Sequence, residues 1–161
     1  MRIIGIDPGL AIVGFGIIDC SSRNPQPVSY GAITTPATLS MGERLLTIRT
    51  HLQSILQTHA PVCCGIERLF FSRNTKTAMA VSQARGVILC TLEEYGIPAF
   101  DYTPTQVKQA VLGFGGADKK QVQFMTKELL RLTRVPQPDD VADALAVAIC
   151  HYHTSSLHYK P

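Results

Sequence analysis

The chain has 161 residues, of which 45% are hydrophobic and 17% charged, and its 15 basic and 12 acidic side chains give a net charge of +3. These totals are ordinary for a folded globular protein, and the length suits one domain. No apolar stretch approaches the length of a membrane span, so we expect no membrane partner. Asp7 interrupts the first apolar run, which argues against a signal peptide.

The cysteines point to a reducing compartment. There are five of them, an odd number, and no two have the C-x-x-C spacing of many metal and redox sites. Four lie in apolar runs, as reduced thiols in a protein core do. We therefore expect a cytoplasmic protein without disulfide bonds.

Basic side chains gather in two stretches. Residues 68–92 contain no acid and four cations, Arg68, Arg73, Lys76 and Arg85. Residues 103–127 contain one acid, Asp118, and the lysines Lys108, Lys119, Lys120 and Lys127. Two basic surfaces on a nearly balanced chain suggest a polyanionic partner such as nucleic acid, although a solvated helix face would have the same composition.

The first part of the chain predicts three antiparallel strands. Residues 3–7 form an apolar run that ends in Asp7, typical of a strand buried on both faces. The Pro8-Gly9 pair that follows predicts a tight turn into a second strand, residues 10–19. Residues 28–34 predict a third strand.

The rest of the chain alternates helices and strands. Ser40 and Glu43 match a capping box at the start of a helix that ends before Pro61. Beyond it we expect strands at residues 62–67 and 97–102, and helices up to residue 95, at 103–112, at 122–132 and from 139 to about 152. The sequence thus predicts one mixed α/β domain over residues 1–161, with a short tail from about residue 154.

Acidic residues end two strands and begin the last helix. Asp7 and Glu67 each close an apolar run, and near the start of the helix either Asp140 or Asp139 shares a face with Asp143. Acids in a first turn also favour the helix dipole, which is the simpler explanation of Asp139 and Asp140. If the two strands are neighbours, the carboxylates form an all-oxygen site for Mg²⁺ or Mn²⁺. Paired ions hydrolyse phosphodiesters, so the basic surfaces and acids together favour a nuclease.

Six sequence blocks resemble the RuvC Holliday-junction resolvases of the RNase H-like superfamily. They are Gly5-Ile6-Asp7-Pro8-Gly9, Ile66-Glu67-Arg68-Leu69-Phe70, Gln83-Ala84-Arg85-Gly86-Val87, Gln106-Val107-Lys108-Gln109, Lys119-Lys120-Gln121-Val122-Gln123 and Asp140-Val141-Ala142-Asp143-Ala144-Leu145-Ala146. They occur in the family's order over nearly the whole chain. The family pattern D-x-x-D-A-L-A selects Asp140 and Asp143 over Asp139, a choice that spacing alone leaves open.

The resemblance implies an RNase H-like fold, with a five-stranded mixed sheet whose first three strands are antiparallel and which is flanked by helices. It implies a homodimer that nicks four-way DNA junctions and works alongside the RuvA and RuvB branch-migration proteins. It also implies two Mg²⁺ ions in each active site, with Mn²⁺ as a substitute, and as catalytic metal ligands Asp7, Glu67, Asp140 and Asp143.

The resemblance also implies DNA-binding residues. Phe70 matches an aromatic that wedges into the junction, and Phe71 is an alternative for this role. Lys108 and Lys119 match lysines near the scissile phosphate, where Lys119 either offsets transition-state charge as a catalytic residue or only grips phosphate. Weaker candidates for backbone contact are Arg68, Arg73, Lys76, Lys120 and Arg85, and a structural role is the alternative for Arg85.

Three other functions fit parts of the same sequence. A YqgF-like RNase shares the superfamily but is disfavoured by the Phe70 loop and the basic helix. A junction-binding module that does not cut would be expected to have lost an acid, and all four are present. A phosphotransferase of the sugar-kinase and actin type requires a second domain, for which 161 residues leave no room.

Overall fold

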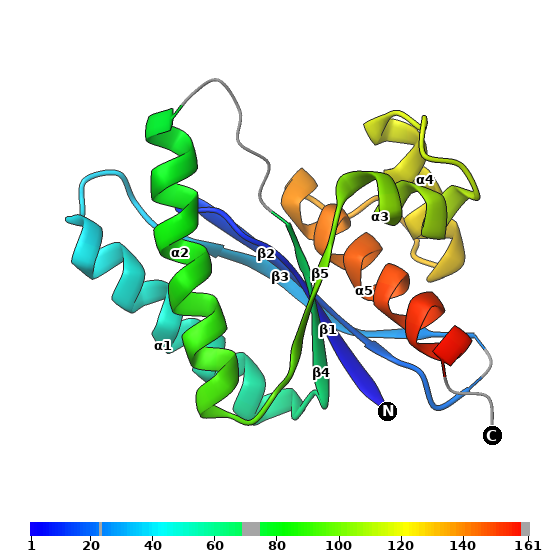
Figure 1. Cartoon of the computed structure of the whole chain (residues 1–161), viewed down its shortest axis with the longest axis horizontal. Helices are drawn as coiled ribbons and strands as arrows, with labels where there is room; N and C mark the ends of the chain where they lie inside the picture. The colour runs from blue at the N-terminus through cyan, green and yellow to red at the C-terminus, as the bar shows by residue number, and fades with distance from the viewer. Residues whose placement is uncertain (23, 69–74, 159–161) are drawn as a thin grey trace.

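The computed structural model describes residues 1–22, 24–68 and 75–158, and in it a five-stranded sheet lies between two layers of helices (Figure 1). The elements in chain order are β1 (Arg2–Asp7), β2 (Ile12–Asp19), β3 (Gln26–Thr34), α1 (Met41–His59), β4 (Cys63–Glu67), α2 (Thr75–Glu94), β5 (Ala99–Tyr102), α3 (Pro104–Leu112), α4 (Lys119–Leu129) and α5 (Asp139–His158). This is the succession of strands and helices that the sequence predicts.

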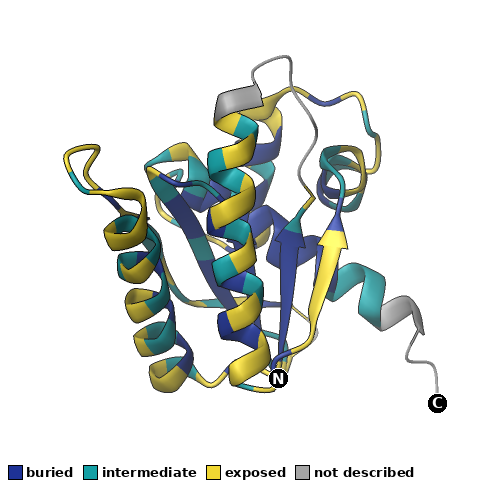
Figure 2. Cartoon of the chain, turned by 60° about the vertical axis from the view of Figure 1, so that its left-hand side comes forward, coloured by how far each residue is buried: buried dark blue, intermediate teal, exposed yellow. Residues whose placement is uncertain are grey.

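The sheet has the mixed topology expected. Its strand order is β3-β2-β1-β4-β5, with β1, β2 and β3 antiparallel and β4 and β5 parallel to β1. The predicted antiparallel arrangement of the first three strands is therefore confirmed. Strand β1 is central and its isoleucines are fully buried, whereas the edge strand β5 is largely exposed (Figure 2).

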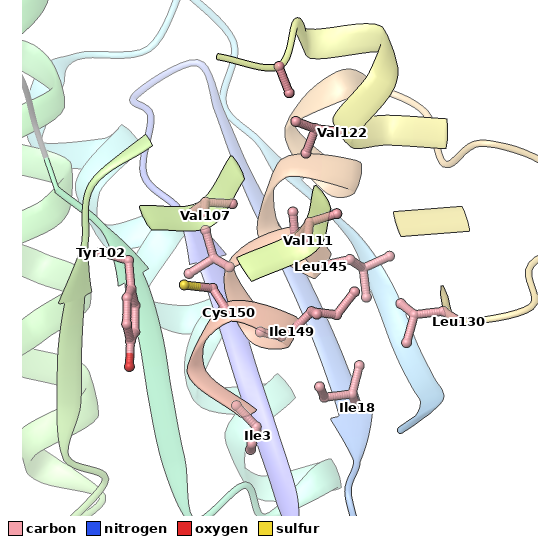
Figure 3. Packing of buried hydrophobic residues seen from close by; sticks show 14 of the residues in the cluster. Ile3, Ile18, Tyr102, Val107, Val111, Val122, Leu130, Leu145, Ile149 and Cys150 are labelled. Atoms are coloured by element: carbon pink, nitrogen blue, oxygen red, sulfur yellow. The ribbon is translucent and has the colours of Figure 1, made fainter. Parts of the chain in front are cut away.

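Helices cover both faces of the sheet. Alternate residues of β1 point to opposite faces, so Ile3 packs in one core while Ile4 and Ile6 pack in the other. Helices α1 and α2 close the core around Ile4 and Ile6, and α5, backed by α3 and α4, closes the core around Ile3 (Figure 1). In Figure 3 the side chains of Val107 and Val111 from α3 lie against α5 within this second core.

The helix ends follow the predicted capping chemistry. Ser40 and Glu43 form a complete capping box at the start of α1, and Glu43 accepts a hydrogen bond from the Ser40 backbone N–H at 2.8 Å. Thr103 caps α3 in the same way, with Pro104 in the first helical position. Gly96, at φ +65°, adopts the left-handed conformation after α2.

Several boundaries differ from the sequence prediction; helix α4, for example, spans Lys119–Leu129 instead of residues 122–132. Strand β2 begins at Ile12, because the turn after Asp7 takes up residues 8–11. Strand β3 begins at Gln26 and includes Pro27, which an edge strand tolerates since one side of it needs no N–H donor. Helix α5 continues to His158, since it contains no glycine or proline to stop it. The prediction of a tail that begins at about residue 154 is therefore wrong. None of the described helices is long and apolar enough to cross a bilayer.

Candidate active site

The ends of two parallel strands bring two of the predicted acids together. Ile6 of β1 is in register with Ile66 of β4, and the next residues along the two strands are Asp7 and Glu67. The carboxyl ends of adjacent parallel strands lie at the same edge of a sheet. The expectation that these strands are neighbours is confirmed, and the two carboxyl groups share a hydrogen bond.

Glycines in the sheet let α5 lie directly on β1 and β2. A Cβ on Gly14, which pairs with Asp7, would lie 2.0 Å from the carbonyl oxygen of Asp140. A Cβ on Gly5 would lie 2.0 Å from the carbonyl oxygen of Ala144. Because any side chain at these positions would displace the helix, the bare backbone fixes the start of α5 beside Asp7. In Figure 1 the first turns of α5 lie where β1 and β4 end.

The four predicted carboxylates interact electrostatically. Burial, followed by the negative charges of Glu67, Asp143 and Asp140, raises the pKa of Asp7 to about 8. Burial, followed by the charge of Asp143, also raises the pKa of Glu67. Asp7 therefore binds a proton at neutral pH in surroundings that favour a positive charge.

Lys119 supplies a positive charge from α4. Its Nζ lies 2.9 Å from Oδ2 of Asp143 and 3.5 Å from Oδ2 of Asp139. Partial burial lowers the pKa of Lys119, but the hydrogen bond and charge of Asp143 raise it overall. Burial raises the pKa of Asp143 even though Lys119 opposes this shift. The Asp118 capping box at the start of α4 fixes the turn that presents Lys119.

The donor set has the chemistry of a hard divalent cation site. It consists of carboxylate oxygens from β1, β4 and α5, and such oxygens are the ligands of Mg²⁺ and Mn²⁺. Within the described ranges, no three Asp, Glu, His or Cys side chains converge closely enough to hold one ion as they stand. Asp143 pairs with Lys119 and Asp7 with Glu67 instead. The raised pKa of Asp7 fits a site that a cation would complete, and the metal ligand set stays a prediction.

Two hollows flank the acids. One, of about 170 Å³, lies between β4, α3, α4 and α5, and its charged lining is Glu67, Asp143, Lys108 and Lys119. Its remaining walls are apolar residues and one proline. The two lysines that the family resemblance places near the scissile phosphate thus lie together with two of the acids.

The other hollow, of about 520 Å³, is more open and lies beyond Asp140. Its wall includes the turn after β1 and the first part of α2, and among the described residues its one cation is Arg44 of α1. Arg44 is not among the residues that the sequence pattern selects, because one arginine on a surface helix has no distinguishing neighbours in the chain.

The other predicted DNA-binding residues fall into three groups. Arg68 and Lys120 are exposed, Arg68 directly after β4 and Lys120 on α4. Arg85 pairs with Asp101, which suits a structural role. Phe70, Phe71 and Arg73 lie outside the described residues, and of Lys76 only its place in α2 is described. The structure thus groups Glu67 and Asp143 with Lys108 and Lys119, and all of the DNA contacts stay predictions.

Comparisons with known proteins show which family the chain is similar to. The model of one protein family, described as crossover junction endodeoxyribonuclease RuvC, matches residues 3–151. Curated proteins of the same description from Brevibacillus brevis and Alkaliphilus oremlandii are 56% and 54% identical over 151 and 156 residues. These alignments cover 94% and 97% of this chain and 91% and 95% of the relatives.

A solved structure extends the likeness to three dimensions. The structure described as "T. thermophilus RuvC in complex with Holliday junction substrate" superposes with a TM-score of 0.94 at 31% identity. The match covers 98% of this chain and 96% of that one. The chain belongs to the RuvC family of crossover junction endodeoxyribonucleases, whose fold is RNase H-like.

Proposed function

We propose that this chain is an endodeoxyribonuclease of DNA recombination and repair that resolves four-way junctions by paired, symmetric nicks. The observation that carries the proposal is the mutual interaction of Asp7, Glu67, Asp140 and Asp143, which come from three elements of the fold. Family membership supports the reaction, and the Thermus thermophilus relative described with a Holliday junction supports the substrate. The whole of residues 1–161 acts as one nuclease domain.

The four carboxylates are the ligands for a pair of divalent ions, Mg²⁺ or in its place Mn²⁺. Bound there, such ions lower the pKa of water and stabilise the leaving oxygen of a phosphodiester. Water adds to phosphorus in line with the 3′-oxygen, and the P–O3′ bond breaks. The products are a 5′-phosphate and a 3′-hydroxyl, which a ligase can rejoin.

Lys119 and Lys108 bind and orient the scissile phosphate from the smaller hollow. Lys119 is close enough to the acids to offset charge that develops on the phosphoryl oxygens, which is the catalytic role we assign to it. Lys120, Arg68, Arg73 and Lys76 contact the DNA backbone. The loop with Phe70 and Phe71 unstacks the junction, at a cost of about a few kcal/mol per base step.

Two nicks related by a two-fold axis require two active sites. One chain supplies one set of four carboxylates, so the functional unit is a homodimer whose axis coincides with that of the junction. The RuvA and RuvB branch-migration proteins are its partners on the same DNA. The protein works in the cytoplasm.

A nicking assay with two adjacent variants tests the proposal. Asp140→Asn removes a metal ligand, whereas Asp139→Asn alters a neighbouring, exposed acid of the same helix turn. We expect Asp140→Asn to abolish Mg²⁺-dependent nicking of a four-way junction while junction binding persists in a gel shift. Asp139→Asn should still cut. Equal activity of both variants would contradict the ligand assignment.

The same assay separates the competing functions. A linear duplex and an RNA stem of equal length serve as alternative substrates for the wild-type protein. Cleavage of RNA in preference to the junction would favour a YqgF-like RNase. Junction binding without nicking in either Mg²⁺ or Mn²⁺ would favour a non-cutting junction-binding module.

A further inference from the structure

The larger hollow, on the opposite side of the acids from Lys108 and Lys119, has the features of an anion site. Asp140 lines this hollow, whereas Glu67 and Asp143 line the smaller one, so the carboxylates lie between the two. Most of the wall is apolar or bare backbone, formed by Gly9, Leu10, Ala11, Ile12, Ala80 and Val81. Of the residues that the structure describes, Arg44 and Asp140 are the charged groups on its wall.

Arg44 is held in place by a buried threonine. Its Nε donates to Oγ1 of Thr35 at 2.8 Å, and its Nη2 donates to the Thr35 carbonyl oxygen at 3.4 Å. Thr35 is only 5% exposed, and its hydroxyl donates in turn to the carbonyl oxygen of Leu10 at 2.5 Å. The guanidinium is therefore fixed to the turn that follows Asp7.

Within the part of the chain that the structure describes, no acid neutralises Arg44. Among the ion pairs of the described residues none includes Arg44, and Asp140, the acid of the same hollow, does not pair with it. Within the same ranges no hydrogen bond of its Nη1 is found. A half-buried cation beside apolar walls costs free energy unless a negative charge pairs with it. Because Thr35 holds one edge of the Arg44 guanidinium, its remaining N–H groups can donate together to one anionic group such as a phosphate.

We propose that Arg44 binds a phosphodiester of the cleaved strand next to the scissile phosphate. This inference rests on the proposed function, since it assigns a second phosphate site to the same active centre. The strand then passes from the Arg44 hollow across the acids to the hollow that contains Lys108 and Lys119. Arg44 binds a phosphate on one side of the scissile phosphate, and Lys108 and Lys119 bind the strand on the other side of the acids. Held at both points, the strand keeps the P–O3′ bond in line with the attacking water.

An alternative role for Arg44 is structural. Its bonds to Thr35 join the start of α1 to the end of β3, and this tie stabilises the fold whether or not DNA binds. The two roles differ in one respect: only a phosphate contact depends on the charge of one particular phosphate in the substrate.

A methylphosphonate scan exploits this difference. Junctions are prepared in which single phosphates within three nucleotides on either side of the scissile one are replaced by neutral methylphosphonates. Each is cut by wild type, Arg44→Gln and Arg44→Lys, and kcat/KM is measured. Arg49→Gln is the matched control, because Arg49 lies on the same helix and pairs with Glu94 instead. Thermal unfolding of every variant is recorded alongside.

We expect Arg44→Gln to lose roughly tenfold or more in kcat/KM on the unmodified junction, as loss of a hydrogen bond to a charged group does. At one phosphate position the methylphosphonate should impose a similar loss on wild type and Arg49→Gln, yet no further loss on Arg44→Gln. Arg44→Lys keeps the charge but lacks the fork, so the same methylphosphonate should cost it less than it costs wild type.

If at every phosphate position the loss in log kcat/KM from the methylphosphonate simply adds to the loss from Arg44→Gln, the assignment is overturned and Arg44 is a structural residue. If Arg44→Gln unfolds, the Arg44→Lys data decide by the same criterion. Nicking of the unmodified junction by wild type reports on the proposed function independently, so its absence would be distinguished from a failure of the Arg44 site.

Discussion

Nζ of Lys119 lies 2.9 Å from Oδ2 of Asp143, so an ammonium group from α4 contacts one of the four acids of α5, β1 and β4. A lysine in this position does two things. It offsets the mutual repulsion of the carboxylates, and it competes with any metal ion for Asp143. Loss of Lys119 should therefore affect catalysis and metal affinity in different ways.

Replacement of Lys119 by Gln should lower kcat for junction nicking about 100-fold, because a cation that faces developing phosphoryl charge is lost. The Mg²⁺ concentration for half-maximal activity should fall or stay constant, since Asp143 is released for the metal. Kinetics at several Mg²⁺ concentrations measure both quantities. Lys120→Gln, on the exposed side of α4, should keep kcat. An unchanged kcat in Lys119→Gln would reduce Lys119 to a phosphate grip.

The metal-free protein should lose stability as pH rises. The pKa of Asp7 is raised to about 8 in the folded protein, whereas its ordinary value is 3.8. Between these values the folded state binds a proton that the unfolded state has released, so the free energy of unfolding falls with rising pH and levels off above about pH 8. Urea unfolding in EDTA at pH 5.5, 7 and 8.5 measures this slope. Mg²⁺ should stabilise the protein more at pH 8.5 than at pH 5.5, because its ligands must be deprotonated.

Asp7→Asn should remove much of that slope and abolish nicking. The variant lacks the titrating group, so it should be more stable than wild type at pH 8.5 in EDTA, by about 1–3 kcal/mol. Asp19→Asn is the control. Hydrogen bonds from Ser21 lower the pKa of the partly exposed Asp19, so Asp19 titrates below this pH range and its removal should leave the slope unchanged. A wild-type slope retained in Asp7→Asn would assign the proton to another group.

Substitution of Gly14 by Ala should damage the site through the backbone. The added Cβ would lie 2.0 Å from the carbonyl oxygen of Asp140, so α5 must move away from β2. We expect a loss of about 3 kcal/mol in stability, and nicking should fall more than junction binding. Gly42→Ala in α1 has open space around the new methyl group and should be neutral or stabilising by up to about 1 kcal/mol. Circular dichroism melts and nicking rates compare the two.

Phe70→Ala should lose cleavage more than affinity if Phe70 is the wedge, because unstacking the junction precedes the cut. A fluorescent base analogue at the crossover reports unstacking directly, and Phe71→Ala in the same assay shows which phenylalanine is responsible. The exposed Phe124 of α4 provides a control substitution. Parallel losses in binding and cleavage would make Phe70 a packing residue.

Much of the fold follows from local chemistry in the sequence. The capping boxes at Ser40 and Thr103 and the left-handed Gly96 set helix ends where the pattern predicts them. Apolar runs that each end in one acid predict the strands of Asp7 and Glu67. The end of α5 was predicted too early because its last turns contain no glycine or proline that marks where the helix stops.

The acids were predictable as a group but not individually. Asp139 and Asp140 occupy the same helix turn, and only the family pattern chose between them. The pairing of Lys119 with Asp143 depends on how α4 packs against α5, which no local spacing encodes. Arg44 was missed because its distinguishing feature, the bond to Thr35, joins residues on different elements of the fold.

The contact of Gly14 and Gly5 with the main chain of α5 has a consequence for sequence drift. Elsewhere in the core, a substitution changes the volume of a side chain and shifts its neighbours. At Gly14 and Gly5 the main chains of the sheet and of α5 are in direct contact, so no side chain whose volume could change lies between them. Leucine, isoleucine and valine elsewhere in the core can therefore replace one another during evolution while the distance between α5 and the sheet stays the same. The chemistry is anchored to the part of the polymer that all amino acids have in common.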